Sequence, residues 1–360
     1  MAPPRRTGRR SLAAAVTALV ILGGLGGTPG SVAPGAAEPL LGFGQESGVI
    51  RHVIVISIDG LRPDAIVRLG EAGAPALHRL MLEGAFTLNA RTLTEQTITL
   101  PNHTGMVTGQ RVDRVAGGTG VTVNTDSGGT VHDTAGRYVA GVFDVVHDNG
   151  GTTGLFVGKV KFDFLDRSWD AAHGAADTVA PDDGRDKIDR YVRSASASRL
   201  AALLAAGEAP TFSFLHLPQP DVAGHHHRWM SRRYLAAVTR ADADVGLVLA
   251  AIDASAARSA DTAVILTSDH GGRGDHHTTV RRPENYTVPF LVWGPGIEHG
   301  DLYAMNPVTR RDPGSDRPGY EGVQPIRNGE VANLALDLLG LPPVPGSLFD
   351  VRQDLEVRAD

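Results

Sequence analysis

Residues 52–60 read His-Val-Ile-Val-Ile-Ser-Ile-Asp-Gly, and this stretch decides the fold. Its apolar run is nearly continuous and rich in β-branched side chains, which is typical of a short strand buried on both faces of a parallel sheet. Asp59 and a glycine end the run, and a helical pattern follows over residues 63–82. The stretch therefore predicts one strand-helix unit of an α/β fold, with an acidic side chain at the carboxyl end of the strand.

The same alternation of strand and helix recurs along the rest of the chain. We expect further strands at residues 152–157, 211–217, 262–267 and 288–293, and further helices at about residues 185–206 and at residues 229–252. This order predicts an α/β fold with a mostly parallel central sheet and helices on both faces. Residues 112–130 and 294–328 are rich in turn-forming residues, so we expect long loops or small insertions there, within a single domain.

The composition excludes several classes of protein. The chain has 360 residues, of which 42% are hydrophobic, so it can bury a large core and is neither disordered nor collagen-like. It contains no cysteine, which excludes a disulfide framework, a cysteine-based zinc ribbon and a thiol nucleophile. Any transition metal must therefore be held by histidine and carboxylate side chains.

The first 37 residues have the features of an export signal. Four arginines precede an apolar run over residues 12–25 that is too short for a permanent membrane anchor. We place the cleavage site after Ala37, with Ala33 as the alternative, and the paired Arg9 and Arg10 make a twin-arginine signal the alternative to the ordinary secretory route. Residues 38–360 then carry 30 basic and 40 acidic side chains, a balance that argues against stable nucleic-acid binding. We expect a secreted protein whose catalytic domain spans residues 38–360 without a membrane span.

Ligand-type side chains stand at the ends of three predicted strands. Asp59 follows the first strand, Asp221 and His225 follow the strand at residues 211–217, and Asp269 and His270 follow the strand at residues 262–267. The carboxyl ends of parallel strands share one edge of a sheet, so these side chains are expected to converge. One acidic residue after a strand is usually a turn or helix cap, but three coincident sites predict a metal-binding edge.

Histidines gather beside these aspartates. Six of the 14 histidines fall in two clusters, at residues 225–227 and 270–277. Asp221 and His225 are four residues apart, so on a helical turn they share one face and can chelate one ion. The two histidines after His225 would point elsewhere. In the second cluster we expect His277 to bind a metal and His276 to lie farther out or in solvent.

Thr99 is the candidate nucleophile. Pro101 is favoured in the first turn of a helix, so Thr99 is expected near a helix N-terminus. Backbone amides and the helix dipole there favour both an alkoxide and a bound phosphate, and a metal ion lowers the hydroxyl pKa further. The alternative is that Thr99 only caps the helix.

Four motifs in this order are similar to those of the alkaline phosphatase superfamily, and especially of the type I phosphodiesterase/nucleotide pyrophosphatase family. They are Asp59-Gly60, Thr99-Leu100-Pro101-Asn102-His103, Pro220-Asp221-x-x-Gly224-His225 and Ser268-Asp269-His270-Gly271, and the resemblance spans roughly residues 51–295. It implies an alkaline phosphatase-like fold and a secreted two-metal phosphoester hydrolase that acts on a small molecule through a phosphothreonine. Zinc suits the ligand types, with Mn²⁺ as the alternative.

The resemblance also implies a role for each residue of the site. One zinc ion would be held by Asp59, Thr99, Asp269 and His270, and the other by Asp221, His225 and His277. Thr99 would be transiently phosphorylated. Asn124 would donate a hydrogen bond to a phosphoryl oxygen, and a turn residue is the alternative interpretation of it.

The chain departs from the family pattern at two positions. Typical nucleotide pyrophosphatases place the last histidine ligand far beyond the Asp-His pair, where this chain has only His299. His277 followed by threonine instead resembles the phosphopentomutase and cofactor-independent phosphoglycerate mutase branch, so we expect His277 as the ligand, then His276, and His299 last. Leu100 stands where nucleotide-processing relatives commonly have an aromatic residue, so nucleobase binding does not follow.

Other activities are alternatives at the same site. Lys159 and Lys161 follow a predicted strand, and they would bind the extra charge of a terminal phosphate in an alkaline phosphomonoesterase or simply solvate the strand end. A phosphosugar mutase-like enzyme and a non-catalytic metal-binding protein are more remote alternatives. A formylglycine sulfatase is a weaker alternative, because the Thr99 motif offers neither the oxidisable residue nor the arginine.

Overall fold

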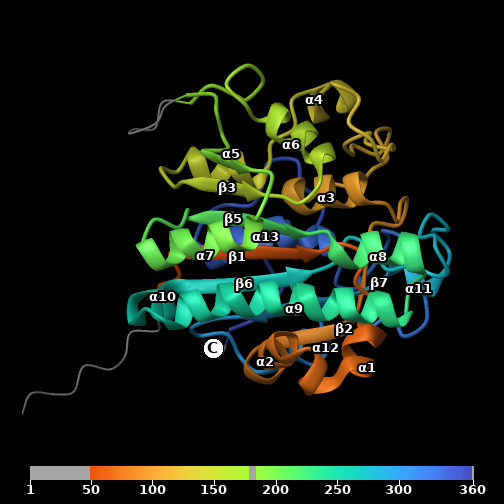
Figure 1. Ribbon diagram of the computed structural model, residues 1–360. Helices are drawn as coiled ribbons and strands as arrows, with labels where there is room; N and C mark the ends of the chain where they lie inside the picture. Colours follow the sequence, from red (N-terminus) through yellow and green to blue (C-terminus); the bar gives the residue numbers. More distant parts are fainter. Residues whose placement is uncertain (1–48, 178–183, 359–360) are drawn as a thin grey trace, which may run out of the picture. The chain divides into compact units, whose positions relative to one another are not determined.

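The computed structural model describes residues 49–177 and 184–358. A single β-sheet lies at the centre of this part of the chain (Figure 1). Its eight strands lie in the order β4-β3-β5-β1-β6-β7-β2-β8. The strands are β1 His52–Ile58, β2 Ala85–Arg91, β3 Thr153–Phe156, β4 Arg190–Val192, β5 Phe212–Leu217, β6 Thr262–Thr267, β7 Thr287–Trp293 and β8 Gly300–Asp301. The proposed export signal lies outside the described residues. Within them, no helix is both long and apolar enough to cross a membrane.

The sheet is mostly parallel. β1 pairs in parallel with β5 on one side and with β6 on the other, and β3 is parallel to β4 and β5. β7 is antiparallel to both β6 and β2. The expected α/β fold is therefore confirmed, and the ends of β5, β1 and β6 lie side by side at one edge.

Helices cover both faces of the sheet. They are α1 Pro63–Gly73, α2 Pro75–Glu83, α3 Thr99–Thr108, α4 Val131–Ala135, α5 Val142–His147, α6 Asp163–Ser168, α7 Ser196–Ala206, α8 Gln219–His227, α9 Arg232–Asp253, α10 Ala256–Asp261, α11 Pro283–Tyr286, α12 Leu302–Met305 and α13 Val331–Leu338, with 3-10 turns at η1 Val160–Phe162 and η2 Asn328–Glu330. Along β1, Val53 and Val55 join a core cluster with side chains of α3, α5 and α13. The alternate residues Ile54 and Ile56 join a second cluster with α1, α2, α7 and α9. Burial on both faces explains the nearly continuous apolar run of this strand.

Two of the predicted helices are shorter in the structure than the sequence pattern indicated. The pattern over residues 63–82 forms two helices, α1 and α2, because Ala74 takes a non-helical conformation before Pro75. Only the second half of residues 185–206 is helical, and the first half contains the short edge strand β4. Strands β2, β4 and β8 were not predicted from the sequence. Residues 112–130 form a loop, as expected, whereas residues 294–328 also carry β8 and α12.

Candidate metal centre

Three neighbouring strands bring the predicted ligands to one edge of the sheet. Asp59 follows β1, Asp221 lies in the first turn of α8 after β5, and Asp269 follows β6. The Asp221 amide donates to the Asp59 carbonyl at 3.0 Å, and the Gly60 amide donates to Asp269 Oδ1 at 3.0 Å. The parallel register of β5, β1 and β6 thus converts three strand ends that are far apart in the sequence into one buried cluster.

The first potential ligand group surrounds Asp59. Donor atoms of Asp59, Asp221 and His270 lie within 4.8 Å of one another, and all three residues are buried. His270 Nε2 lies 3.6 Å from Asp59 Oδ1 and 3.2 Å from Asp269 Oδ2. These are the residue types and spacings that a transition metal bound by carboxylate and imidazole requires.

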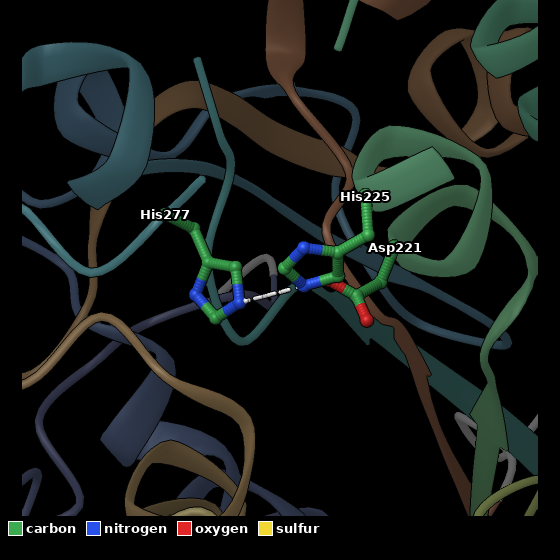
Figure 2. A group of neighbouring side chains, drawn as sticks. All are labelled: Asp221, His225 and His277. Carbon is green, nitrogen blue, oxygen red and sulfur yellow. Dashed lines mark hydrogen bonds and ion pairs between the residues drawn. The ribbon is translucent and has the colours of Figure 1, made fainter. Parts of the chain in front are cut away.

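The second group consists of Asp221, His225 and His277 (Figure 2). Asp221 and His225 project from the same face of α8, and their Oδ1 and Nε2 atoms lie 3.3 Å apart. His277 Nε2 approaches from the opposite side, 3.1 Å from His225 Nε2 and 3.8 Å from Asp221 Oδ1. Asp221 belongs to both groups, so the two potential sites are adjacent.

The three histidines share one hydrogen-bonding pattern. Each donates from Nδ1 to a backbone carbonyl: His225 to Asp275 at 2.9 Å, His270 to Gly271 at 2.8 Å and His277 to Thr97 at 2.6 Å. Each Nε2 is then left with its lone pair directed into the cluster, as in the metal-binding histidines of other proteins. Burial lowers the pKa of His270 to about 3 and also lowers the pKa of His277, so both are in the neutral form that binds metal ions.

Buried polar atoms without hydrogen bonds mark the same place. Within the described residues, five of them belong to predicted ligands: Asp59 Oδ1, Thr99 Oγ1, Asp221 Oδ1, Asp269 Oδ2 and His270 Nε2. A buried polar group without a partner costs about 1–3 kcal/mol, and more when it is charged. Cations bound to these atoms would remove that cost, so the donor set fits bound metal.

The cluster also holds more negative charge than its own lysine neutralises. Lys159 Nζ lies 2.6 Å from Asp59 Oδ2 and 2.6 Å from Asp221 Oδ2. Burial by itself would raise the pKa of Asp59, but Lys159 and a hydrogen bond from His216 hold it well below its usual range. In contrast, burial and the charge of Asp59 raise the pKa of Asp269 well above its usual range. Additional positive charge at this edge of the sheet would reduce the repulsion between the Asp59 and Asp269 carboxylates.

Thr99 is the first residue of α3 and is buried beside the cluster. The chain is fixed to the ligands on both sides of it. Thr97 lies two residues earlier. Its hydroxyl donates to the His277 carbonyl, and its backbone carbonyl accepts from His277 Nδ1. His103, one turn later, donates to the Thr99 carbonyl at 2.8 Å, and its ring lies 3.6 Å from Asp269. The Thr99 hydroxyl is thereby held at a helix N-terminus, where a phosphate is favoured.

The side chains of Asn124 and Lys161 each keep a hydrogen-bond donor that is not used within the described residues. The Leu100 amide donates to Asn124 Oδ1 at 3.0 Å, which leaves the side-chain amide Nδ2 available as a donor. The ammonium group of Lys161, a residue of η1, makes no hydrogen bond to a described residue, and burial, followed by the charge of Lys159, lowers the pKa of Lys161. Lys159 is committed to the carboxylates, so Lys161 is the more available cation of the pair.

The structure separates the candidates for the last histidine ligand. His277 is buried in the cluster, whereas His276 is 75% exposed and pairs with Asp275. His299 is exposed just before β8, the outermost strand of the sheet. His226 and His227, next to His225, are exposed as well.

The polar residues that support the cluster were not predicted from the sequence. His216, inside β5, lies 2.8 Å from Asp59 Oδ2, and Asn328 donates to the Ser268 carbonyl at 3.1 Å and to Asn102 at 3.2 Å. A histidine within an apolar strand five residues before Asp221 was a visible signal. Asn328 carried no such signal, because only the fold brings residues so distant in the chain together.

Comparisons with known proteins identify a family and several relatives. A family model described as type I phosphodiesterase/nucleotide pyrophosphatase matches residues 53–280. GPI ethanolamine phosphate transferase 1 of Mus musculus is 26% identical over 257 residues, 69% of this chain and 27% of that protein. The Neurospora crassa protein of the same name is 34% identical over 113 residues, 30% of this chain and 10% of the relative. The chain thus spans about a quarter or less of the length of these relatives.

The fold is also similar to solved structures. Murine ectonucleotide pyrophosphatase/phosphodiesterase 5 superposes with a TM-score of 0.55 at 15% identity, covering 85% of this chain and 100% of the murine chain. An inactive threonine-to-alanine variant of that protein, in complex with AMP, gives the same TM-score at 14% identity, covering 82% of this chain and 96% of the other. These likenesses show the fold.

Proposed function

The chain belongs to the type I phosphodiesterase/nucleotide pyrophosphatase family, and from this premise we propose that it is a metal-dependent hydrolase of phosphodiester or phosphoanhydride bonds that acts through a phosphothreonine at Thr99. The observation that carries the proposal is the set of five unpartnered buried atoms, which come from the ends of β1 and β6 and from α3 and α8. A protein selected for stability alone would have paired them.

Two divalent cations fit the donor set. Asp59, Thr99, Asp269 and His270 would hold one, and Asp221, His225 and His277 would hold the other. We propose Zn²⁺, because mixed imidazole and carboxylate donors suit it, with Mn²⁺ as the alternative. Bound there, such cations would lower the pKa of an adjacent hydroxyl and stabilise negative charge on a phosphoryl group.

The residues of the chain would act in two steps. Thr99 Oγ1 gives up its proton to water and attacks phosphorus, so that a bond from Oγ1 to phosphorus forms while the bond to the leaving oxygen breaks and that oxygen departs with the bonding electrons. Water then cleaves the threonine-phosphate bond and releases the phosphoryl product. Asn124 Nδ2 would donate to a phosphoryl oxygen in both steps. The inactivity of the murine threonine-to-alanine variant supports a threonine nucleophile.

The test is a comparison of initial rates on bis(p-nitrophenyl) phosphate and p-nitrophenyl phosphate, before and after chelation and with zinc or manganese restored. We expect a metal-dependent excess of activity on the diester. Bound metal with no turnover of either ester would contradict the proposal and favour the mutase-like or metal-binding alternatives. Because the matched relatives are named as ethanolamine phosphate transferases, an alcohol acceptor should be included, and preferential transfer to it would make the protein a transferase.

A phosphomonoesterase is the second candidate, and Lys161 favours it. A terminal phosphate carries one more negative charge than a diester, and the Lys161 ammonium makes no hydrogen bond to a described residue. If the protein is a monoesterase, Lys161→Ala should lower kcat/KM for the monoester by about tenfold or more and leave the diester rate nearly unchanged. Equal losses on both substrates would remove this role of Lys161.

We further propose that residues 1–37 direct export of the protein. The arginines followed by an apolar run support this, and the net acidity of residues 38–360 is compatible with a secreted enzyme. Mass spectrometry of the exported protein would locate the new N-terminus, which we expect at Glu38. An exported chain that keeps its first residues would contradict the signal.

A further inference from the structure

His216 forms hydrogen bonds in the opposite sense to the three histidines of the metal centre. The Gly158 amide donates to His216 Nδ1 at 3.2 Å. An N–H group can donate only to an unprotonated ring nitrogen, so the proton of His216 lies on Nε2. That Nε2 lies 2.8 Å from Asp59 Oδ2, to which it donates. The ring is therefore a neutral donor to a carboxylate rather than a nitrogen ligand directed at the cluster.

The contact fixes which oxygen of Asp59 is available. Oδ2 accepts from His216 and, at 2.6 Å, from Lys159, whereas Oδ1 has no hydrogen bond within the described residues. Asp59 has no exposed surface, so bulk water cannot orient its carboxylate. The two donors on Oδ2 hold the group so that only Oδ1 is presented to the potential metal site.

The position of the His216 ring is set by close packing. It lies in β5 opposite Ser57 of β1, and its ring centre is 4.5 Å from that of Phe162 and 5.1 Å from that of His103. Gly158 can reach it because a glycine fits against Pro218: a Cβ at Gly158 would lie 2.5 Å from the proline ring. Both hydrogen-bond partners and the ring packing therefore allow one orientation.

We propose that His216 is a positioning residue that presents Asp59 Oδ1 to the metal centre. This inference rests on the proposed function, since it assumes that the cluster binds metal ions. Loss of a residue that orients a metal ligand typically lowers metal affinity about 10-fold to 100-fold. A purely structural core histidine would change stability without changing metal affinity.

The experiment compares two replacements of His216. His216→Leu fills similar space without a donor, whereas His216→Gln places an amide N–H close to the position of Nε2. His132→Leu is the matched control, because His132 also accepts a backbone N–H at Nδ1 and donates from Nε2, but to the Ser168 carbonyl and away from the cluster. Zinc affinity is measured by competition with a chromophoric chelator. The visible spectrum of the Co²⁺-loaded protein reports the coordination, and thermal unfolding of the metal-free protein reports stability.

We expect His216→Leu to weaken zinc binding by about 10-fold to 100-fold and to change the Co²⁺ spectrum. His216→Gln should recover most of the affinity, and His132→Leu should lower thermal stability without changing affinity. Wild-type affinity in His216→Leu, or an equal loss in the Gln and Leu variants, would overturn the positioning role while leaving the metal centre intact. A wild-type protein that binds neither zinc nor manganese would instead overturn the proposed function, and the role of His216 with it.

Discussion

Two buried groups of acidic side chains in this molecule meet the same electrostatic problem in different ways. At the carboxyl edge of the sheet, three aspartates share one lysine, Lys159. In the C-terminal part of the chain, Glu330, Asp350 and Asp354 converge on Arg310, and each receives its own guanidinium N–H at 3.2, 2.9 and 2.8 Å respectively. In the second group every carboxylate thus contacts the cation directly, whereas Lys159 forms ion pairs with only two of its three aspartates.

The difference lies in what each group leaves unpaired. In the Arg310 group one buried carboxylate oxygen has no partner, Asp350 Oδ2, and a proton can satisfy it because burial and the charge of Glu330 raise the pKa of Asp350 to about 8. In the metal centre the unpaired atoms belong to five residues, and a single proton cannot serve them. A paired acidic cluster is thus expected to support the fold, and an incompletely paired one to bind ligands.

The largest effect that separates the two groups should come from Thr99→Ala. Loss of the nucleophile is expected to lower kcat by at least about 10³-fold, while the other predicted ligands still hold metal. Steady-state rates combined with metal analysis of the same sample would measure this. Because Thr99 does not contact the Arg310 group, unfolding should be little changed. A variant within tenfold of the wild-type rate would contradict the assignment of the nucleophile.

Arg310→Met should have the converse effect. It leaves buried carboxylates without their cation, which is expected to lower the free energy of unfolding by about 3–5 kcal/mol. Urea titration would measure the loss, and the activity of the remaining folded protein should match that of the wild type. A large loss of activity at unchanged stability would mean that the Arg310 group is functional, and the contrast with the metal centre would fail.

A third prediction compares the metal affinity of His277→Ala with that of His276→Ala. Removal of the buried His277 Nε2 should lower the affinity for one of the two metal ions by about 100-fold or more. Removal of the exposed His276 should leave both ions bound. Titration of each metal-free variant with zinc gives the stoichiometry directly. Equal binding by both variants would move the last ligand elsewhere.

The strands that the sequence predicted and those that it did not differ in where their contacts lie. β1 and β6 are apolar on both faces, so composition alone identified them. β2 ends in polar residues whose partners come from a distant loop: Asn89 donates to Asp312 and Arg91 donates to the Asp316 carbonyl. Such pairings are absent from any local pattern. The short edge strand β4 was included in a predicted helix, because its pairing with β3 is also a contact between distant parts of the sequence.

The sequence predicted which ligand-type residues gather at the site, but it did not predict how their side chains are oriented. Strand ends located Asp59, Asp221 and Asp269, because parallel topology determines where they meet. Residue type could not distinguish His276 from His277. The turn in which Arg273 and His276 exchange backbone hydrogen bonds directs the second histidine inward. The supporting donors depend in the same way on tertiary contacts.

The smallest expected effect is a pH dependence confined to the Arg310 group. An aspartate in the unfolded chain has a pKa near 3.9, whereas burial, followed by the charge of Glu330, raises that of Asp350 to about 8. The folded protein therefore binds a proton that the unfolded chain does not, and this stabilisation is fully present below about pH 4 and is lost as pH rises towards 8.

Asp350→Asn removes the titration, and asparagine tolerates the positive φ of 50° at this position. We expect the stability of the variant relative to the wild type to rise by about 1 kcal/mol between pH 5 and pH 8, since Glu330 shares part of the titration. Urea unfolding of both proteins across this range would measure the difference, and a difference independent of pH would show that Asp350 keeps its charge and that the two acidic groups are less distinct than their geometry indicates.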